Sequence, residues 1–170
     1  MSNILFVCTA NICRSPAAEA IARTRFGSGV HRFASAGFLF ENRVAEPDMV
    51  RALGDVGVDA SLHRSRILSD DIIDGADIIL TMEARHVQDL SVKSAEIFAK
   101  TLPLVEAANR LAHGPMQTDS FLASFSGRDP MAYFDARWDV EDPYKRSRRK
   151  YRKSVEQIWE LVGAVVPALT

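Results

Sequence analysis

The sequence contains little cysteine: only Cys8 and Cys13 among its 170 residues. Two cysteines so close together are too few for the disulfide framework of a secreted domain, and they offer no four-ligand zinc pattern. The four histidines are scattered without the spacing of metal ligands. We therefore expect neither a metal nor another cofactor, and the two thiols are either reactive or simply buried.

Long apolar runs and a strong net charge are also missing. No run approaches the ~20 apolar residues that a bilayer span needs, and no basic segment of a secretory signal opens the chain. The net charge is −1 and the pI about 6.4, so no basic field attracts the protein to nucleic acid or to an anionic membrane. These absences predict a cytoplasmic protein whose partners include neither nucleic acid nor membrane.

The composition that remains is that of a folded globule. Hydrophobic residues make up 47% of the chain and charged residues 25%, which argues against disorder and coiled coil. A chain of 170 residues suits one core, since division into domains usually begins beyond ~250 residues. We predict a single domain over residues 1–170.

Short apolar runs alternate with helical patterns along the first hundred residues. We expect strands at 4–7, 32–36, 76–82 and 95–100, and helices at 16–23, 48–56, 69–73, 83–90 and, at the end of the chain, 151–166. Each crossover between parallel strands must lay its helix on a face of the sheet. The order therefore predicts a parallel sheet covered on both faces. Residues 111–140, with many Gly, Pro, Ser and Asp and weak periodicity, are interpreted as an irregular excursion.

The turn after the first strand carries the chemistry. Cys8 ends that strand and Arg14 follows six residues later, where Ser15 before Pro16 signals the start of a helix. Backbone amides, a helix N-terminus and a planar guanidinium together suit an oxyanion, and they favour thiolate over thiol. The arrangement predicts phosphoryl transfer to Cys8. The alternative is a cysteine buried as a small hydrophobe.

Residues 8–16, Cys-Thr-Ala-Asn-Ile-Cys-Arg-Ser-Pro, resemble the signature C-x-x-N-x-C-R-S-P of the low-molecular-weight protein tyrosine phosphatases. The resemblance continues through Ser-Ala-Gly at 35–37, His-Arg-Ser-Arg at 63–66, the apolar run 76–82 and Glu-Asp-Pro-Tyr at 141–144, which is similar to the family's acid loop. It implies a four-stranded parallel sheet with helices on both faces and a phosphate-binding loop between the first strand and the first helix.

By this resemblance Cys8 is the nucleophile, Arg14 binds the phosphate and the transition state, and Asp142 is the general acid and base. The resemblance assigns to the phosphate-binding loop Thr9, Ala10, Asn11, Ile12, Cys13 and Ser15. Asn11, Ser15 and Ser35 are expected to support this loop, because asparagine tolerates left-handed backbone and a serine hydroxyl can donate to the thiolate. Without the loop, Asp142 before Pro143 would equally suit a turn or a cap.

Aromatic side chains near these motifs predict the rim of the site. Phe40 and Tyr144 would bracket a flat ring and favour aryl phosphates. The alternative for Phe38 or Phe40 is that its side chain packs in the core, which is as consistent with the sequence as a place on the rim. Cys13 lies close enough in sequence for a disulfide with Cys8, and the resemblance implies redox protection; the alternative is packing alone. The basic stretch 145–153 either forms a solvated face or attracts acidic peptides that flank a phosphotyrosine.

The function expected from the resemblance is hydrolysis of phosphotyrosine in a protein or peptide, with a cognate tyrosine kinase as a further partner. One alternative is an arsenate reductase that uses an external thiol. A second is a non-catalytic module that binds phosphopeptides or senses redox state. The acid loop favours ester hydrolysis, because arsenate reduction has no phenolate to protonate.

Overall fold

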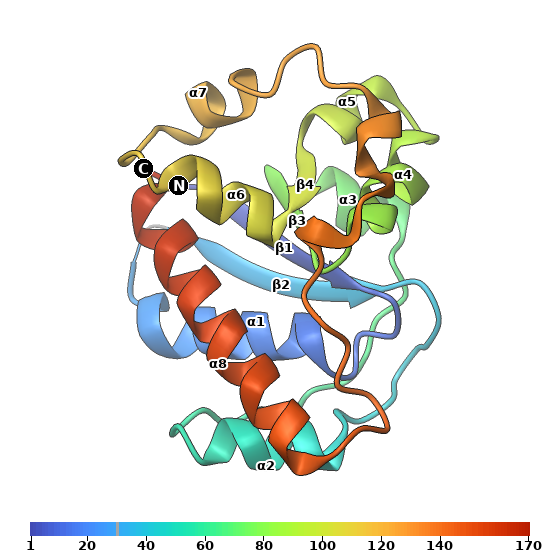
Figure 1. Ribbon diagram of the computed structural model, residues 1–170, viewed down its shortest axis with the longest axis vertical. Coiled ribbons are helices and arrows are strands. Elements are labelled where there is room, and N and C mark those ends of the chain that lie inside the picture. The colour runs from blue at the N-terminus through green and yellow to red at the C-terminus, as the bar shows by residue number, and fades with distance from the viewer. Residues whose placement is uncertain (30) are drawn as a thin grey trace.

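A four-stranded parallel sheet in the order β2-β1-β3-β4 forms the centre of the computed structural model, which describes residues 1–29 and 31–170 (Figure 1). The strands are β1 (Asn3–Cys8), β2 (Arg32–Gly37), β3 (Ile78–Thr81) and β4 (Thr101–Pro103). All three strand pairings are parallel. The prediction of a single α/β domain with a four-stranded parallel sheet is confirmed.

Strand β1 lies in the interior of the sheet and contributes side chains to both of its faces. Ile4 and Phe6 pack in one hydrophobic cluster, whereas Leu5 and Val7 pack in a second cluster. All four are almost completely buried. A strand covered on both faces is apolar at every position rather than at alternate ones, which explains the continuous apolar run in the sequence.

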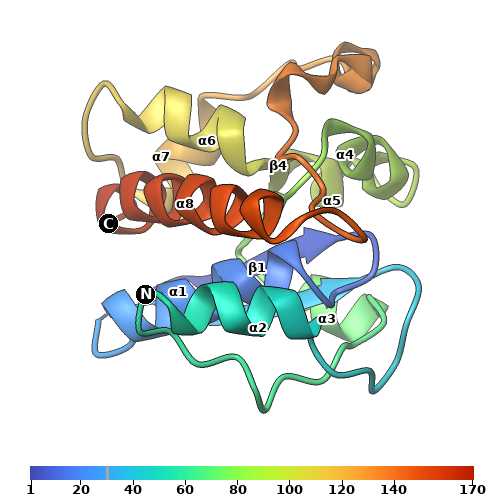
Figure 2. The same ribbon diagram turned by 60° about the horizontal axis from the view of Figure 1, so that its bottom comes forward.

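Helices cover both faces of the sheet, as predicted. The first cluster is completed by α1 (Arg14–Phe26), α2 (Pro47–Gly54), α6 (Leu104–Leu111), α7 (Thr118–Ala123) and α8 (Arg148–Val165), and the second by α3 (Asp70–Asp74), α4 (Ala84–Ser91) and α5 (Ala95–Ala99). Helix α8, red in Figure 2, packs against α1, α2 and α6. Its apolar residues at helical spacing are buried, including Val155, Ile158 and Val162.

The prediction of a strand at 95–100 is wrong. These residues form helix α5, and the last strand begins only at Thr101. The Ser94 side chain accepts a hydrogen bond from the Ile97 backbone N–H at 3.1 Å, and Glu96 adds an acidic group in the first turn. Both features stabilise a helix start. The local capping signal was therefore more informative than the apolar composition of this segment.

Ser15, which precedes Pro16 and was expected to mark the start of a helix, does not cap helix α1 with its hydroxyl. Helix α1 already begins at Arg14, its N-cap residue is Cys13, and no side chain caps it. The Ser15 hydroxyl instead points back to the sulfur of Cys8 at 3.0 Å. The first turn of the helix is thus continuous with the loop that the sequence assigned to phosphate binding.

The excursion at 111–140 is more ordered than expected. It contains α7 and two short 3₁₀ helices, η1 (Pro130–Phe134) and η2 (Ala136–Trp138). The guanidinium of Arg128 anchors the segment by donating to the backbone oxygens of Phe98 and Thr101 and to the hydroxyl of Tyr133. Val140 then returns to the sheet through a 2.8 Å bond from its N–H to the oxygen of Met82. This return places residues 140–144 beside the carboxyl end of β3.

Strand β2 forms one edge of the sheet, and arginines cover its outward carbonyls. Arg23 on α1 donates to the Phe33 oxygen at 2.9 Å, and Arg66 donates to the Ser35 oxygen at 2.8 Å. Gly37 pairs with the segment 66–68 through its own N–H and oxygen. The edge strand therefore has its outward backbone oxygens at 33, 35 and 37 hydrogen-bonded.

Candidate active site

The loop between β1 and α1 turns back on itself at Asn11. Asn11 has left-handed backbone with φ 52°, and its N–H points to the sulfur of Cys8 at 3.3 Å. Gly37 of the neighbouring strand leaves room for this turn, because a Cβ there would lie 2.8 Å from the Asn11 nitrogen and 2.9 Å from the Cys8 oxygen. The loop is thus drawn tightly over the carboxyl end of β1, with Cys8 buried at its base.

The side chain of Asn11 fixes the loop to its surroundings. Its amide nitrogen donates to the hydroxyls of Ser15 and Ser35, both at 2.9 Å, and its oxygen accepts from the Arg66 backbone N–H. The Ser15 hydroxyl in turn donates to the Cys8 sulfur at 3.0 Å, a shorter contact than the 3.4 Å that separates it from the Ala36 backbone oxygen. The structure therefore brings together the three residues that the sequence assigned to loop support.

Two further residues support the loop from behind, and neither was given this position by sequence reasoning. Ser35 donates to the Glu19 carboxylate at 2.6 Å, and His63 donates from Nε2 to the Asn11 backbone oxygen at 2.7 Å. A carbonyl only accepts, so Nε2 carries the proton. Burial lowers the pKa of His63 even though this bond and the charge of Glu19 oppose that change.

Arg14 is buried and surrounded by acceptors. Its guanidinium contacts Glu83 at 2.6 Å, Asp142 at 2.9 Å and the Val140 backbone oxygen at 3.0 Å. Burial acts against the charge, but Cys8, Asp142 and Glu83 together raise the pKa of Arg14. Among the described residues these contacts take three of the five N–H groups, so two remain to bind an oxyanion.

Glu83 is the residue that sequence reasoning missed most clearly. Its burial would raise the pKa of the carboxyl, but Arg14 and its other cationic neighbours hold that pKa below the ordinary value. The signal was present: Glu83 comes two residues after β3, and the carboxyl ends of adjacent parallel strands meet at one edge. Glu83 holds the guanidinium of Arg14 in place.

Asp142 and Asp139 have different surroundings. Asp142 pairs with Arg14 and accepts from the Tyr144 N–H at 3.1 Å, and about half of its side chain is exposed. Asp139 accepts from the Ala84 N–H at 2.7 Å and so holds the first turn of α4. Asp142 is therefore the acidic group of this segment that both lies beside Arg14 and reaches solvent.

The residues predicted to form the rim lie on the two segments that flank the loop. The N–H of Phe38 donates to the Thr9 oxygen at 2.8 Å, which ties the turn carrying Phe40 to the loop, while Tyr144 follows Asp142. Phe38 is the phenylalanine that packs inward, stacking on His86 with ring centroids 5.2 Å apart. Phe40 is only partly buried, below Arg43, and Tyr144 is 38% exposed.

Both cysteines are buried and free. Burial, together with the charges of Cys8 and Asp142, raises the pKa of the Cys13 thiol, so Cys13 stays protonated at neutral pH. Among residues 1–29 and 31–170, no group of three or more His, Cys, Asp or Glu side chains is arranged to hold a metal ion. In the same described ranges, no helix is both long and apolar enough to cross a membrane.

His86 should make the stability of the protein depend on pH. Its ring is 1% exposed, bonds the Thr9 hydroxyl at 3.0 Å, and has a pKa lowered by burial from 6.5 to about 4. The neutral ring therefore stabilises the fold above pH 6.5, and this contribution is lost as the pH falls towards 4. We expect a loss on the order of 3 kcal/mol in the free energy of unfolding, measured by urea denaturation.

The matched controls are His86→Gln and His113→Gln. The first variant should lose most of this pH dependence, because the ring that resists protonation is gone. The second removes an exposed histidine and should leave the slope unchanged. Equal slopes in the wild type and in His86→Gln would show that other groups cause the acid destabilisation.

Comparison with known proteins finds matches over most of the chain. Residues 3–114 match the family model described as low molecular weight phosphotyrosine protein phosphatase. Over 169 residues the chain is 28% identical to a probable low molecular weight protein-tyrosine-phosphatase, EpsP, of Ralstonia nicotianae, covering 99% of this chain and 97% of that protein. Over 170 residues it is 34% identical to a protein-arginine-phosphatase of Bacillus subtilis, covering 98% and 96%.

A solved structure is similar over the whole chain. The low molecular weight protein tyrosine phosphatase of T. tengcongensis superposes with a TM-score of 0.77 at 28% identity, covering 99% of this chain and 100% of that one. The match therefore extends beyond the loop to the sheet and to the helices on both of its faces.

Proposed function

Because the chain belongs to the low molecular weight phosphotyrosine protein phosphatase family and is an enzyme of that class, we propose that it hydrolyses aryl phosphate monoesters through a phosphocysteine intermediate. The observation that carries the proposal is that Cys8 and Arg14 lie at the two ends of one loop and that Asp142, from a distant segment, pairs with Arg14. The Ser15 hydroxyl lies 3.0 Å from the Cys8 sulfur, and the Asp142 carboxylate lies 2.9 Å from the Arg14 guanidinium. A nucleophile, an oxyanion ligand and an acid are the groups that this reaction needs.

In the first step the Cys8 thiolate attacks phosphorus. An S–P bond forms and the bond from phosphorus to the phenolic oxygen breaks. Asp142, in its acid form, gives its proton to the departing oxygen. The free N–H groups of Arg14 and the loop amides bind the equatorial oxygens, on which the charge of the transition state is spread.

In the second step water attacks the phosphocysteine. Asp142 takes a proton from the water, an O–P bond forms, and the S–P bond breaks to release phosphate. The Ser15 hydroxyl donates to the sulfur as negative charge returns to it, which makes Cys8 a better leaving group. The half-exposed Asp142 side chain has access to solvent, which suits both of its roles.

The substrate we propose is phosphotyrosine in a protein or peptide, made by a tyrosine kinase in the cytoplasm. Phe40 and Tyr144 present apolar surface on the segments beside the loop, which suits a flat ring. The 34% identity to a protein-arginine-phosphatase makes phosphoarginine the second candidate. Its guanidine leaving group also needs a proton, so the same three residues would serve.

Initial rates with peptides of one sequence, carrying phosphotyrosine, phosphoarginine or phosphoserine, test this proposal. All assays contain a chelator. We expect the highest kcat/KM with phosphotyrosine. A higher value with phosphoarginine would reassign the substrate while keeping the mechanism.

Two other outcomes would point to the remaining functions. Turnover of arsenate with a low-molecular-weight thiol, without ester hydrolysis, would indicate an arsenate reductase. Binding of phosphopeptide without turnover would indicate a non-catalytic module. Both results would contradict the proposed hydrolase.

Hydrogen peroxide should inactivate the enzyme reversibly. Peroxide oxidises the Cys8 thiolate to a sulfenic acid, and the Cys13 thiol then condenses with it, forming an S–S bond and releasing water. We expect mass spectrometry to find a Cys8–Cys13 disulfide at a loss of two hydrogens, and a thiol reductant to restore most of the activity.

The variant Cys13→Ser tests this role. After the same dose of peroxide it should carry sulfinic or sulfonic acid at Cys8 and recover several-fold less of its own initial activity. Equal fractional recovery in the variant and the wild type would mean that Cys13 only packs behind the loop.

A further inference from the structure

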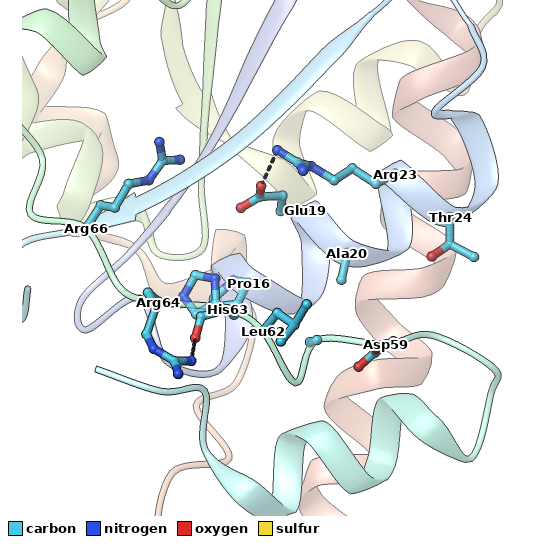
Figure 3. A pocket seen from close by; sticks show the side chains of 11 residues that line it. Pro16, Glu19, Ala20, Arg23, Thr24, Asp59, Leu62, His63, Arg64 and Arg66 are labelled. Atoms are coloured by element: carbon cyan, nitrogen blue, oxygen red, sulfur yellow. Dashed lines mark hydrogen bonds and ion pairs between the residues drawn. The ribbon is translucent and has the colours of Figure 1, made fainter. Parts of the chain in front are cut away.

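A polar pocket of about 400 Å³ lies behind the phosphate-binding loop, between helix α1 and the segment 59–66 (Figure 3). Its charged or titratable lining consists of Glu19, Arg23, Asp59, His63, Arg64 and Arg66, and its apolar lining includes Pro16, Ala20 and Leu62. Three arginine side chains thus line one pocket that the proposed reaction does not use.

Backbone oxygens hold these guanidinium groups. Arg23 and Arg66 bond the carbonyls of β2, as described above, and Arg64 donates to the His63 oxygen at 2.8 Å. A guanidinium has five N–H groups, so each arginine retains donors after these contacts. Groups already held in place lose little conformational freedom when a ligand arrives.

The two carboxylates of the pocket already have partners. Glu19 is bound by Arg23 at 2.8 Å and by the Ser35 hydroxyl at 2.6 Å. Asp59 accepts from the Ser61 N–H at 2.8 Å. Arg64 and Arg66 therefore supply positive charge that neither carboxylate contacts, and this charge attracts an anion.

We propose that this pocket binds a small organic anion that carries two or more carboxylate or phosphate groups. Arg23 lies on α1, whereas Arg64 and Arg66 lie on the facing segment, so separate anionic groups reach separate guanidinium groups (Figure 3). Leu62, which is 87% exposed, and Ala20 offer apolar contact to the carbon skeleton between them.

The pocket is linked to the loop through two side chains in its wall. Glu19 reaches Asn11 through Ser35, and His63 contacts the Asn11 oxygen directly at 2.7 Å. An anion that binds Arg23 competes with Glu19 for this guanidinium, and this changes the hydrogen bonds that reach Asn11 through Ser35. Resting on the proposed function, we infer that the anion alters the kcat of the enzyme without competing with its substrate.

Calorimetric titration tests the site itself. Citrate and pyrophosphate serve as multivalent probes, acetate as the monovalent control, all at one ionic strength. We expect saturable binding of at least one multivalent probe, weakened roughly tenfold in Arg64→Ala. The two probes distinguish a carboxylate site from a phosphate site. Arg64 is exposed, so this change leaves the fold intact.

Arg149→Ala is the matched control, since it removes the same charge from an exposed position on α8 and should change the affinity less than twofold. Amide NMR shifts locate the bound probe, with changes expected at Ala20 and Arg64. No saturable binding, equal affinity in wild type and Arg64→Ala, or shifts confined to residues 8–14 would each overturn the site. None of these measurements needs turnover, so a failure of the anion site can be distinguished from a failure of the proposed function.

Steady-state kinetics with an aryl phosphate test the link to the loop. The bound probe should change kcat by twofold or more with little effect on KM, and Arg64→Ala should remove this effect without changing the rate in its absence. A probe that binds the pocket but leaves kcat unchanged would overturn the link. Purely competitive inhibition, equal in wild type and variant, would do the same.

Discussion

Cys8→Ser should reduce kcat for aryl phosphates by at least about four orders of magnitude. A serine hydroxyl is almost entirely protonated at neutral pH, and it is a poor leaving group in the second step. Asn11 and Ser15 both direct donors at the Cys8 sulfur, an arrangement that stabilises a thiolate. The change removes the nucleophile and keeps the shape of the side chain.

Phosphate binding should survive this change. The loop amides and Arg14 are untouched, and Glu83 continues to hold the guanidinium. Calorimetry should therefore find phosphate affinity within about tenfold of the wild type, because only contacts of the sulfur are lost. Turnover close to that of the wild type would remove Cys8 from the mechanism. Loss of phosphate binding as well would mean that Cys8 is needed for the loop itself.

The second large effect is expected for Asp142→Ala. With poor leaving groups such as an alkyl-substituted phenol, kcat should fall by roughly 10²–10⁴-fold, because the phenolate then leaves without a proton. With an activated leaving group such as nitrophenolate, the loss should be about tenfold or less. The dependence on the leaving group, measured over a series of phenols, separates an acid from a structural residue.

Two neighbouring acidic residues supply the controls. Glu141→Gln removes a charge from an exposed residue that pairs with Lys150, and it should show no dependence on the leaving group. Asp139→Asn should lower stability rather than kcat, because Asp139 holds the first turn of α4. An equal loss for all phenols in Asp142→Ala would make Asp142 structural and direct the search to Asp139.

The parts of the site that the sequence predicted lie close together in the chain or within a compact motif. Cys8, Asn11, Arg14 and Ser15 belong to one turn, so their proximity follows from chain connectivity. Asn11 was expected to accept left-handed backbone, and it does, with φ 52°. The Ser15 hydroxyl also donates to the Cys8 sulfur, as predicted for a serine that supports the loop.

The parts that the sequence did not predict depend on contacts across the fold. Glu83 is 69 residues from Arg14, and only the pairing of β1 with β3 brings their segments to one edge. The contact between His63 and the Asn11 oxygen spans 52 residues. Periodicity and motif spacing report on local structure, so such distant pairs become visible only once the order of the strands is known.

The covered edge of strand β2 has a consequence for the behaviour of the protein at high concentration. An open edge strand is a template on which another chain can add by backbone hydrogen bonds, the first step in sheet-mediated aggregation. Arg23 and Arg66 occupy the oxygens at Phe33 and Ser35 that an added strand would use, and they also set positive charges along the approach. The same two arginines therefore disfavour the addition of a strand from another chain at this edge of the sheet.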